Sequence, residues 1–350
     1  MTALLIVGHG TRDATGAEEF RRFTRRVERR AVARAGLGVD AVAGGFIELS
    51  PPPLRDAVQE LVAAGSSDVA AVPLILLAAG HAKGDIPAAL ARERQRHPGL
   101  KTRYGRPLGV HPVILDLLRE RLAASAGSDA DAVLLVGRGT TDPDANADLY
   151  RAARLLWETT RQSGVEQVEP AFVSLAHPSV DEGLARLRRL GARRVAVLPF
   201  FLFPGVLPDR IAAQAEAAAA QHGMDVSVAG VIGDCDALAD LVLERYAEAA
   251  GGKVSVNCDA CVYRIALPGF EHRVGAAQHP HDHPDDPAHG QAGHEHGAHV
   301  HPAHREGAHA HPHTHSHDPA HAPGSGPSSA RSVQGRDSVE TRHAGSPSMR

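Results

Sequence analysis

Short apolar segments alternate with longer amphipathic segments along this chain, and the same order occurs twice. Apolar runs predict buried strands, and apolar residues at helical spacing predict helices. In the first half the expected strands are 3–7, 39–47, 69–77 and 101–104, and the expected helices are 18–35, 54–64, 86–96 and 113–122. Alternating strands and helices require parallel crossovers, so the sequence predicts an α/β fold with doubly wound parallel sheets.

Three motifs recur in the same order at nearly one spacing. Residues 3–13 (ALLIVGHGTRD) match residues 132–142 (AVLLVGRGTTD), with Gly137 aligned to Gly8. Residues 46–54 match residues 172–180, and residues 72–77 match residues 198–203. Because this period is too long for a solenoid repeat, we expect two tandem duplicated domains.

The composition changes near Gly251, after which His, Pro, Gly and Asp dominate. We therefore expect domains at residues 1–126 and 127–250, a C-x-x-C segment at 251–272 and a disordered tail at 273–350. Most of the 23 histidines lie between His279 and His321, in a stretch that cannot bury a core. Such a tail is interpreted either as a buffer for Co²⁺, Ni²⁺, Zn²⁺ or Cu²⁺, or as a solvated linker without a role.

Bulk properties exclude several classes of protein. A net charge of -4 argues against a nucleic-acid partner, and three cysteines are too few for a disulfide framework. The apolar run near the N-terminus is too short for a signal peptide, and the longest apolar stretch, residues 69–80, is too short for a membrane span. We expect a cytoplasmic protein, a monomer or a homodimer, with no membrane partner.

Three potential metal ligands follow three of the expected strands. His9 follows the first strand, Glu48 the second, and His81 comes a few residues after the third. Because ligands of an open parallel sheet bind beyond the carboxyl ends of its strands, these side chains can converge on one pocket. Two imidazoles and a carboxylate suit a divalent ion such as Co²⁺, Fe²⁺, Ni²⁺ or Zn²⁺.

The second half keeps the scaffold motifs and lacks these ligands. Arg138 stands in place of His9, Ser174 in place of Glu48, and an apolar pair, Val206-Leu207, in place of Gly80-His81. Folding alone does not require this asymmetry. It favours a functional role for the two histidines over the alternative that they are ordinary polar loop residues.

The loop Gly8–Asp13 is neither a G-x-G-x-x-G nor a Walker A sequence, so we expect no nucleotide cofactor. A hydrolase is disfavoured because the chain has no G-x-S-x-G elbow.

Residues 8–13 (GHGTRD), 46–49 (FIEL) and 77–87 (LAAGHAKGDIP) resemble the sirohydrochlorin chelatases of cobalamin and siroheme biosynthesis, over about residues 1–250. The resemblance implies ATP-independent insertion of Co²⁺ or Fe²⁺ into sirohydrochlorin by two chelatase domains facing one cleft. It implies catalytic, metal-binding histidines at positions matching His9 and His81, with Glu48 beside the tetrapyrrole. The residues expected to bind the substrate are Gly10, Thr11, Arg12, Leu77, Ala78, Ala79, Gly80 and Arg138.

These side chains suit the reaction that the resemblance implies. Neutral histidine can hold a metal ion or accept a pyrrole proton, and Glu48 can complete the coordination or relay protons. Sirohydrochlorin carries eight carboxylates, and arginine can bind a carboxylate through two parallel hydrogen bonds. We therefore expect Arg138 to bind a substrate carboxylate, with Arg12 opposite it, and the second domain to perform no metal chemistry.

Cys258 and Cys261 form the C-x-x-C, which supplies half of a zinc or Fe–S site. Long members of the resembled family carry a similar pair and a His-rich stretch, and some hold an Fe–S cluster. Two subunits could jointly provide four cysteines, or the pair has no such role. For the whole chain the alternative to a Co²⁺-preferring chelatase is a non-catalytic metal buffer or metallochaperone that acts through its tail.

Overall fold

The computed structural model describes residues 2–34, 36–125, 129–255, 261, 263, 266 and 268–276. The His-rich stretch and Cys258 lie outside these residues. In the part of the chain that is described, no helix is both long and apolar enough to cross a membrane.

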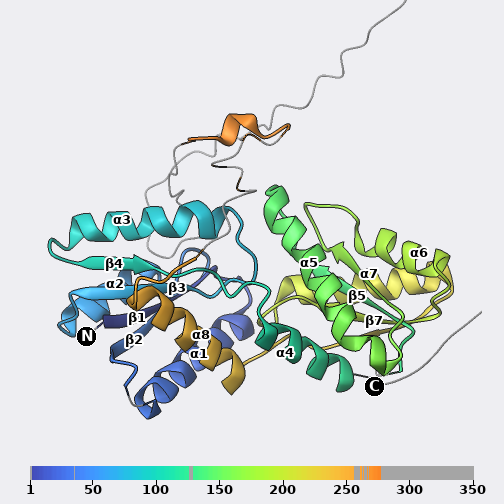
Figure 1. Cartoon of the computed structure of the whole chain (residues 1–350), viewed down its shortest axis with the longest axis horizontal. Helices are drawn as coiled ribbons and strands as arrows, with labels where there is room; N and C mark the ends of the chain where they lie inside the picture. Colours follow the sequence, from blue (N-terminus) through green and yellow to red (C-terminus); the bar gives the residue numbers. More distant parts are fainter. Residues whose placement is uncertain are drawn as a thin grey trace, which may run out of the picture. The chain divides into compact units, whose positions relative to one another are not determined.

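The first half forms a parallel four-stranded sheet in the order β2-β1-β3-β4 (Figure 1). Its strands are β1 (Thr2–Gly8), β2 (Val39–Phe46), β3 (Asp68–Pro73) and β4 (Lys101–Tyr104). Its helices are α1 (Ala14–Ala33), α2 (Leu54–Ala63), α3 (Ile86–Arg96) and α4 (Pro112–Ala123), and a short π-helix, η1 (His81–Asp85), precedes α3. All the expected elements are present.

The second half repeats this architecture in a sheet of order β6-β5-β7-β8. The strands are β5 (Ala132–Gly137), β6 (Gln167–Phe172), β7 (Arg194–Pro199) and β8 (Asp225–Val228). The helices are α5 (Pro143–Thr160), α6 (Val180–Arg189), α7 (Val206–His222) and α8 (Asp236–Ala250), with short 3₁₀ turns η2 (Arg161–Ser163) and η3 (Glu271–Arg273). The predicted α/β fold with two duplicated parallel sheets is therefore confirmed.

The apolar patterns of the sequence account for the layers. Residues Ala3–Val7 of β1 are fully buried, as expected for a central strand covered by helices on both faces. Helix α1 buries Phe20, Phe23 and Val27 on one face, and the Asp13 carboxylate caps its N-terminus by accepting a hydrogen bond from the Gly16 N–H.

The third strand is shorter than expected, because it ends at Pro73 and not at Leu77. The apolar residues after it, Leu74 and Leu76, are buried in a core cluster and not in the sheet. Residues that pack in a core and residues that pair in a buried strand are both apolar, so the apolar run in the sequence extends beyond the end of the strand.

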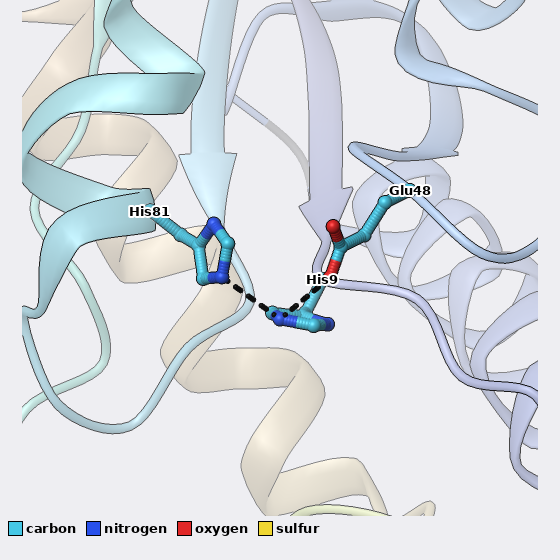
Figure 2. A group of neighbouring side chains, drawn as sticks. All are labelled: His9, Glu48 and His81. Atoms are coloured by element: carbon cyan, nitrogen blue, oxygen red, sulfur yellow. Dashed lines mark hydrogen bonds and ion pairs between the residues drawn. The ribbon is translucent and has the colours of Figure 1, made fainter. Parts of the chain in front are cut away.

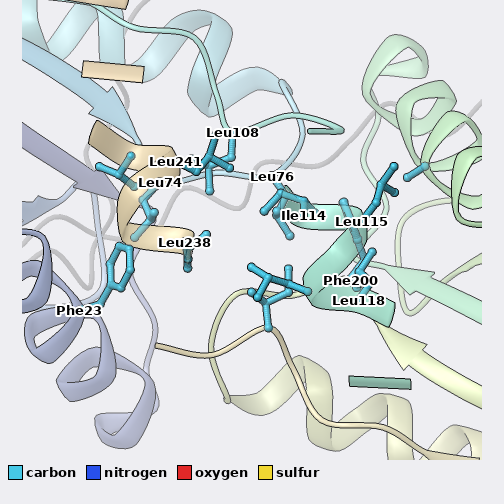
Figure 3. Packing of buried hydrophobic residues seen from close by; sticks show 14 of the residues in the cluster. Phe23, Leu74, Leu76, Leu108, Ile114, Leu115, Leu118, Phe200, Leu238 and Leu241 are labelled. Atoms are coloured by element: carbon cyan, nitrogen blue, oxygen red, sulfur yellow. The ribbon is translucent and has the colours of Figure 1, made fainter. Parts of the chain in front are cut away.

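The two halves exchange their last helices. Helix α8, from the end of the second half, packs on α1 and β3 of the first, while α4, from the end of the first half, packs on α5 and β7 of the second. One core cluster accordingly contains residues of both halves, including Phe23, Leu74, Leu238, Ile114 and Phe200 (Figure 3). Both halves belong to one unit, Met1–Gly293.

Candidate metal site

The loops after β1 and β2 remain paired beyond the ends of the strands. The Ile47 N–H donates to the Gly8 carbonyl at 3.0 Å, and the Glu48 N–H donates to the His9 carbonyl at 3.2 Å. Gly10 follows with φ of 105°, and a Cβ there would lie 1.8 Å from the Glu48 carbonyl oxygen. Only glycine permits this conformation and this close approach, which brings His9 and Glu48 side by side.

His81 comes from the first residue of the π-helix η1. The Ile86 N–H donates to the His81 carbonyl, which gives this turn its wider winding. Single π-turns often occur at functional sites. The turn also places Asp85 beside His81, with Asp85 Oδ2 2.6 Å from His81 Nδ1.

The three predicted ligands converge (Figure 2). His9 Nε2 lies 3.0 Å from His81 Nε2 and 3.1 Å from Glu48 Oε1. One potential ligand atom from each residue lies within 4.8 Å of the others. Glu48 is only 5% exposed, whereas both histidines are partly accessible, so an ion reaching the imidazoles would meet a shielded carboxylate behind them.

Hydrogen bonds on the far side of each imidazole set its tautomer. His9 Nδ1 lies 3.0 Å from the Gly10 carbonyl oxygen, which can only accept, and this contact favours the tautomer that carries the proton on Nδ1. His81 Nδ1 likewise donates to the Asp85 carboxylate. Both Nε2 atoms are then left with lone pairs, the arrangement in which histidine binds metals.

Two lone pairs 3.0 Å apart repel each other unless a positive charge lies between them. The nearby Glu48 carboxylate adds further negative potential at the same point. The geometry therefore suits a shared proton or a metal cation, and the ligand types suit a divalent first-row transition metal.

An arginine from the second half reaches this site. Arg138 Nη1 lies 3.5 Å from His9 Nε2, at the limit of a hydrogen bond. Arg138 is exposed, as is Arg12, which lies in the same loop as His9. The residue that replaces His9 in the repeat thus approaches His9 itself, while the predicted placement of Arg12 opposite it stays a prediction.

The other expected pocket residues have mixed surroundings. The Thr11 N–H donates to Ser50 Oγ at 3.0 Å, and Ser50 Oγ donates back to the Thr11 carbonyl at 2.5 Å, so Thr11 holds two loops together. Residues 77–80 are partly exposed, and a Cβ on Gly80 would meet nothing within 4 Å. Open space next to His81 fits a segment that lines a pocket, and its contact with substrate stays a prediction.

Three residues of the site were not predicted from the sequence. Asp85 orients His81, the Tyr104 hydroxyl donates to the Ala82 carbonyl at 2.7 Å, and Lys83 forms ion pairs with the second half. The i,i+4 spacing of His81 and Asp85 could have revealed the first. Nothing in the sequence distinguishes Lys83 from a solvated lysine, or Tyr104 from an ordinary strand residue.

The C-x-x-C segment is only partly described. Cys261 is partly exposed, and Cys258 lies outside the described residues. A zinc or Fe–S site at this pair stays a prediction.

Comparison with known proteins decides the family of the chain. The CbiX family model matches residues 3–125 and matches again at residues 132–249. The chain belongs to the CbiX family. A sirohydrochlorin cobaltochelatase of Priestia megaterium is 37% identical over 276 residues, which cover 76% of this chain and 86% of that protein. A sirohydrochlorin ferrochelatase of Bacillus subtilis (strain 168) is 30% identical over 249 residues, 71% of this chain and 92% of that protein.

Solved structures of CbiX-like chelatases have the same architecture. SirB from Bacillus subtilis with Fe³⁺ superposes with a TM-score of 0.62 at 28% identity, covering 73% of this chain and 100% of SirB. The sirohydrochlorin chelatase SirB from Bacillus subtilis subspecies spizizenii in complex with cobalt gives a TM-score of 0.59 at 29% identity, covering 72% of this chain and 97% of that one. The predicted resemblance to the sirohydrochlorin chelatases is therefore confirmed.

Proposed function

We propose that this protein inserts a divalent metal ion into sirohydrochlorin, with the metal held by His9, His81 and Glu48 and without a nucleotide. The observation that carries the proposal is the convergence of two imidazole lone pairs and a shielded carboxylate at one edge of the first sheet. The substrate is proposed from the names of the CbiX-family relatives, which are sirohydrochlorin chelatases.

The site suits both halves of the reaction. A metal ion entering the macrocycle must lose water, and the two Nε2 atoms and Glu48 Oε1 can replace part of that water shell. Two pyrrole N–H protons must also leave the macrocycle. As the metal passes to the pyrrole nitrogens, the imidazoles regain their lone pairs and can accept those protons, and Asp85 stabilises the positive charge that forms on His81.

Arg138 is proposed to bind a substrate carboxylate. In the structure its guanidinium approaches the same His9 Nε2 that would bind the metal. A guanidinium and a divalent cation repel each other at that distance. A carboxylate of sirohydrochlorin would draw Arg138 away from His9, so the arriving macrocycle would favour entry of the metal.

Cobalt is the proposed metal, with Fe²⁺ next. Imidazole ligands favour the later first-row ions over Fe²⁺. The relatives do not separate the two, since they include both cobaltochelatases and ferrochelatases. The relative turnover of Co²⁺ and Fe²⁺ in competition, with purified protein, tests this choice.

The deciding experiment follows the absorption spectrum of sirohydrochlorin with Co²⁺, in the presence and absence of the protein. We expect the protein to accelerate the spectral change of metal insertion, with no effect of added ATP. A rate equal to that of the protein-free reaction, or a requirement for ATP, would refute the proposal. The alternative, a metal buffer acting through the tail, predicts metal binding without this acceleration.

A further inference from the structure

One lysine joins the metal-site helix to the second half of the chain. Lys83 Nζ lies 2.9 Å from Asp142 Oδ2 and 2.8 Å from Asp144 Oδ2. The side chain of Lys83 is 13% exposed, that of Asp142 2% and that of Asp144 19%. This is a shielded ion cluster, in contrast to the exposed pairs elsewhere on the surface, and removing one partner of a shielded pair leaves an uncompensated charge.

The position of Lys83 connects the cluster to the site. Lys83 is two residues from His81 in the same π-turn, η1. Its partner Asp142 is anchored in turn, because its Oδ1 accepts the Asp144 N–H and caps helix α5. The carboxylates that hold Lys83 are therefore fixed to the start of a long helix of the second half.

The ion cluster occurs in only one copy of the duplication. Asp13 is the counterpart of Asp142 and caps α1 in the same way. At the spacing that aligns residues 72–77 with 198–203, the counterpart of Lys83 is Asp209. The equivalent pair would therefore consist of two carboxylates, Asp209 and Asp13, with no cation. The copy that keeps His9 and His81 is thus also the copy whose π-turn carries the lysine.

We propose that Lys83 is a positioning residue for the metal site, which fixes η1 against Asp142 and Asp144 and so holds His81 Nε2 at its short distance from His9 Nε2. On this proposal the second half, which lacks the metal ligands, contributes to the geometry of the metal site. The proposal rests on the proposed metal site at His9, His81 and Glu48, and its kinetic consequences rest in addition on the proposed reaction.

Two further hydrogen bonds of η1 come from the first half. The Tyr104 hydroxyl donates to the Ala82 carbonyl at 2.7 Å, and the Lys83 N–H donates to the Ala79 carbonyl at 2.9 Å. These bonds hold the backbone of the turn on one side, and the Lys83 ammonium holds it on the other.

The test compares Co²⁺ binding by full-length variants, followed by the visible absorption of bound cobalt. Any cobalt that the His-rich tail binds would be common to all variants, so the spectrum of His9→Ala is subtracted from each. The variants are Lys83→Met and Asp144→Asn, which remove the ion pairs, and Lys83→Arg, which keeps the charge. Arg106→Gln is the matched control, because Arg106 pairs with Glu248 of α8 at 2.8 and 2.6 Å, an ion pair between the two halves that does not involve a residue of η1.

We expect Lys83→Met and Asp144→Asn to weaken cobalt binding at the site at least about ten-fold and to alter its absorption bands. Such losses are typical when a partner that orients a metal ligand is removed. Lys83→Arg should recover part of the affinity, and Arg106→Gln should bind cobalt like the unmodified protein. If Lys83→Met keeps the affinity and the bands, or if Arg106→Gln loses as much as Lys83→Met, the positioning role is refuted.

Turnover gives a second readout. With sirohydrochlorin varied at saturating cobalt, Lys83→Met should lower kcat and leave KM for the tetrapyrrole nearly unchanged. The two proposals fail in different ways. If His9→Ala binds as much cobalt as the unmodified protein, the metal site itself is wrong; if only His9→Ala loses cobalt and Lys83→Met does not, the site stands and the role of Lys83 falls.

Discussion

At His9 Nε2, three side chains approach one lone pair: His81 at 3.0 Å, Glu48 at 3.1 Å and Arg138 at 3.5 Å. His81 and Glu48 can bind the same metal ion as His9. Arg138 is itself a cation, so it can only occupy the position that a metal ion would take. A metal bound at the proposed site would therefore compete with Arg138 for the same nitrogen. The balance between them depends on what else Arg138 can bind.

Replacing either histidine should abolish most of the activity. We expect His9→Ala or His81→Ala to lower the rate of metal insertion by about 100-fold or more, the usual contribution of a positioned acid–base group. His97→Ala, at the C-cap of α3, is a suitable control, since His97 lies outside the cluster. Circular dichroism should show the fold intact, and near-normal turnover in either variant would rule out the assigned roles.

Arg138→Ala should affect substrate and metal in opposite directions. Loss of a bidentate carboxylate contact costs about 1.5–3 kcal/mol, so KM for sirohydrochlorin should rise about ten- to a hundred-fold. Cobalt binding to the protein alone should stay as tight or become tighter, because a competing cation has gone. Steady-state kinetics and a cobalt titration measure both, with Arg154→Ala, on the exposed side of α5, as the control.

An unchanged KM in Arg138→Ala would leave that arginine without a binding role. A fall in kcat alone would mean that the second half takes part in the metal chemistry.

Strand-end positions were enough to predict that His9, Glu48 and His81 lie close together, because parallel strands deliver their carboxyl ends to one edge. The residues that hold these ligands were harder to find. Asp85 lies at helical spacing from His81, but the turn that uses this spacing is a π-turn that no periodicity indicates. Lys83 finds its partners about 60 residues away in the other half, and such a pairing leaves no local pattern.

At the scale of elements, the duplicated loops after β1 and β5 allow the same substitution to be compared at two equivalent positions. Gly10 and Gly139 both have positive φ, 105° and 84°, and a Cβ on either would lie within 2 Å of a carbonyl oxygen, that of Glu48 or Ser174. We expect Gly10→Ala and Gly139→Ala each to cost roughly 1–3 kcal/mol of stability, from strain at a conformation that alanine disfavours.

Only Gly10→Ala should also disrupt the metal site, because the displaced backbone is that of His9 and Glu48. Thermal unfolding and cobalt binding, measured on both variants, separate the two effects. Equal losses of cobalt binding in the two variants would contradict this picture.

Helix exchange was the largest element-scale feature that the sequence did not predict. The pattern of α8 shows an apolar face, with Leu238 and Leu241 buried, but an apolar face does not specify which sheet it covers. The order of strands and helices favours packing within each repeat, and α4 and α8 do the reverse. The same ambiguity made the third strand look longer than it is.

For the whole molecule, the exchange predicts that the first half cannot fold alone. A fragment of residues 1–126 would expose the surface of β3 and α1 that α8 covers. We expect this fragment to aggregate or to lack a cooperative thermal transition, and to regain one when residues 127–276 are co-expressed with it. A monomeric fragment that unfolds cooperatively at the temperature of the full chain would show that α8 is dispensable.

The tail can be tested separately from the metal site. Because the proposed ligands all precede Gly251, truncation after Pro268 should preserve chelation at saturating metal while lowering the number of Co²⁺ or Ni²⁺ ions bound per chain. Equilibrium dialysis with metal analysis measures this number. An unchanged stoichiometry would remove the buffering hypothesis.

The exchange of α4 and α8 also has a consequence during synthesis of the protein on the ribosome. His9, Glu48 and His81 are all made early, but the sheet that carries them is completed by a helix that ends at Ala250. At about 5–20 residues per second, the delay between α4 and α8 is on the order of 10 s. During that interval the nascent chain carries the proposed metal ligands without the complete scaffold that brings them together, so we expect it to capture metal at this site only once both halves have been synthesised.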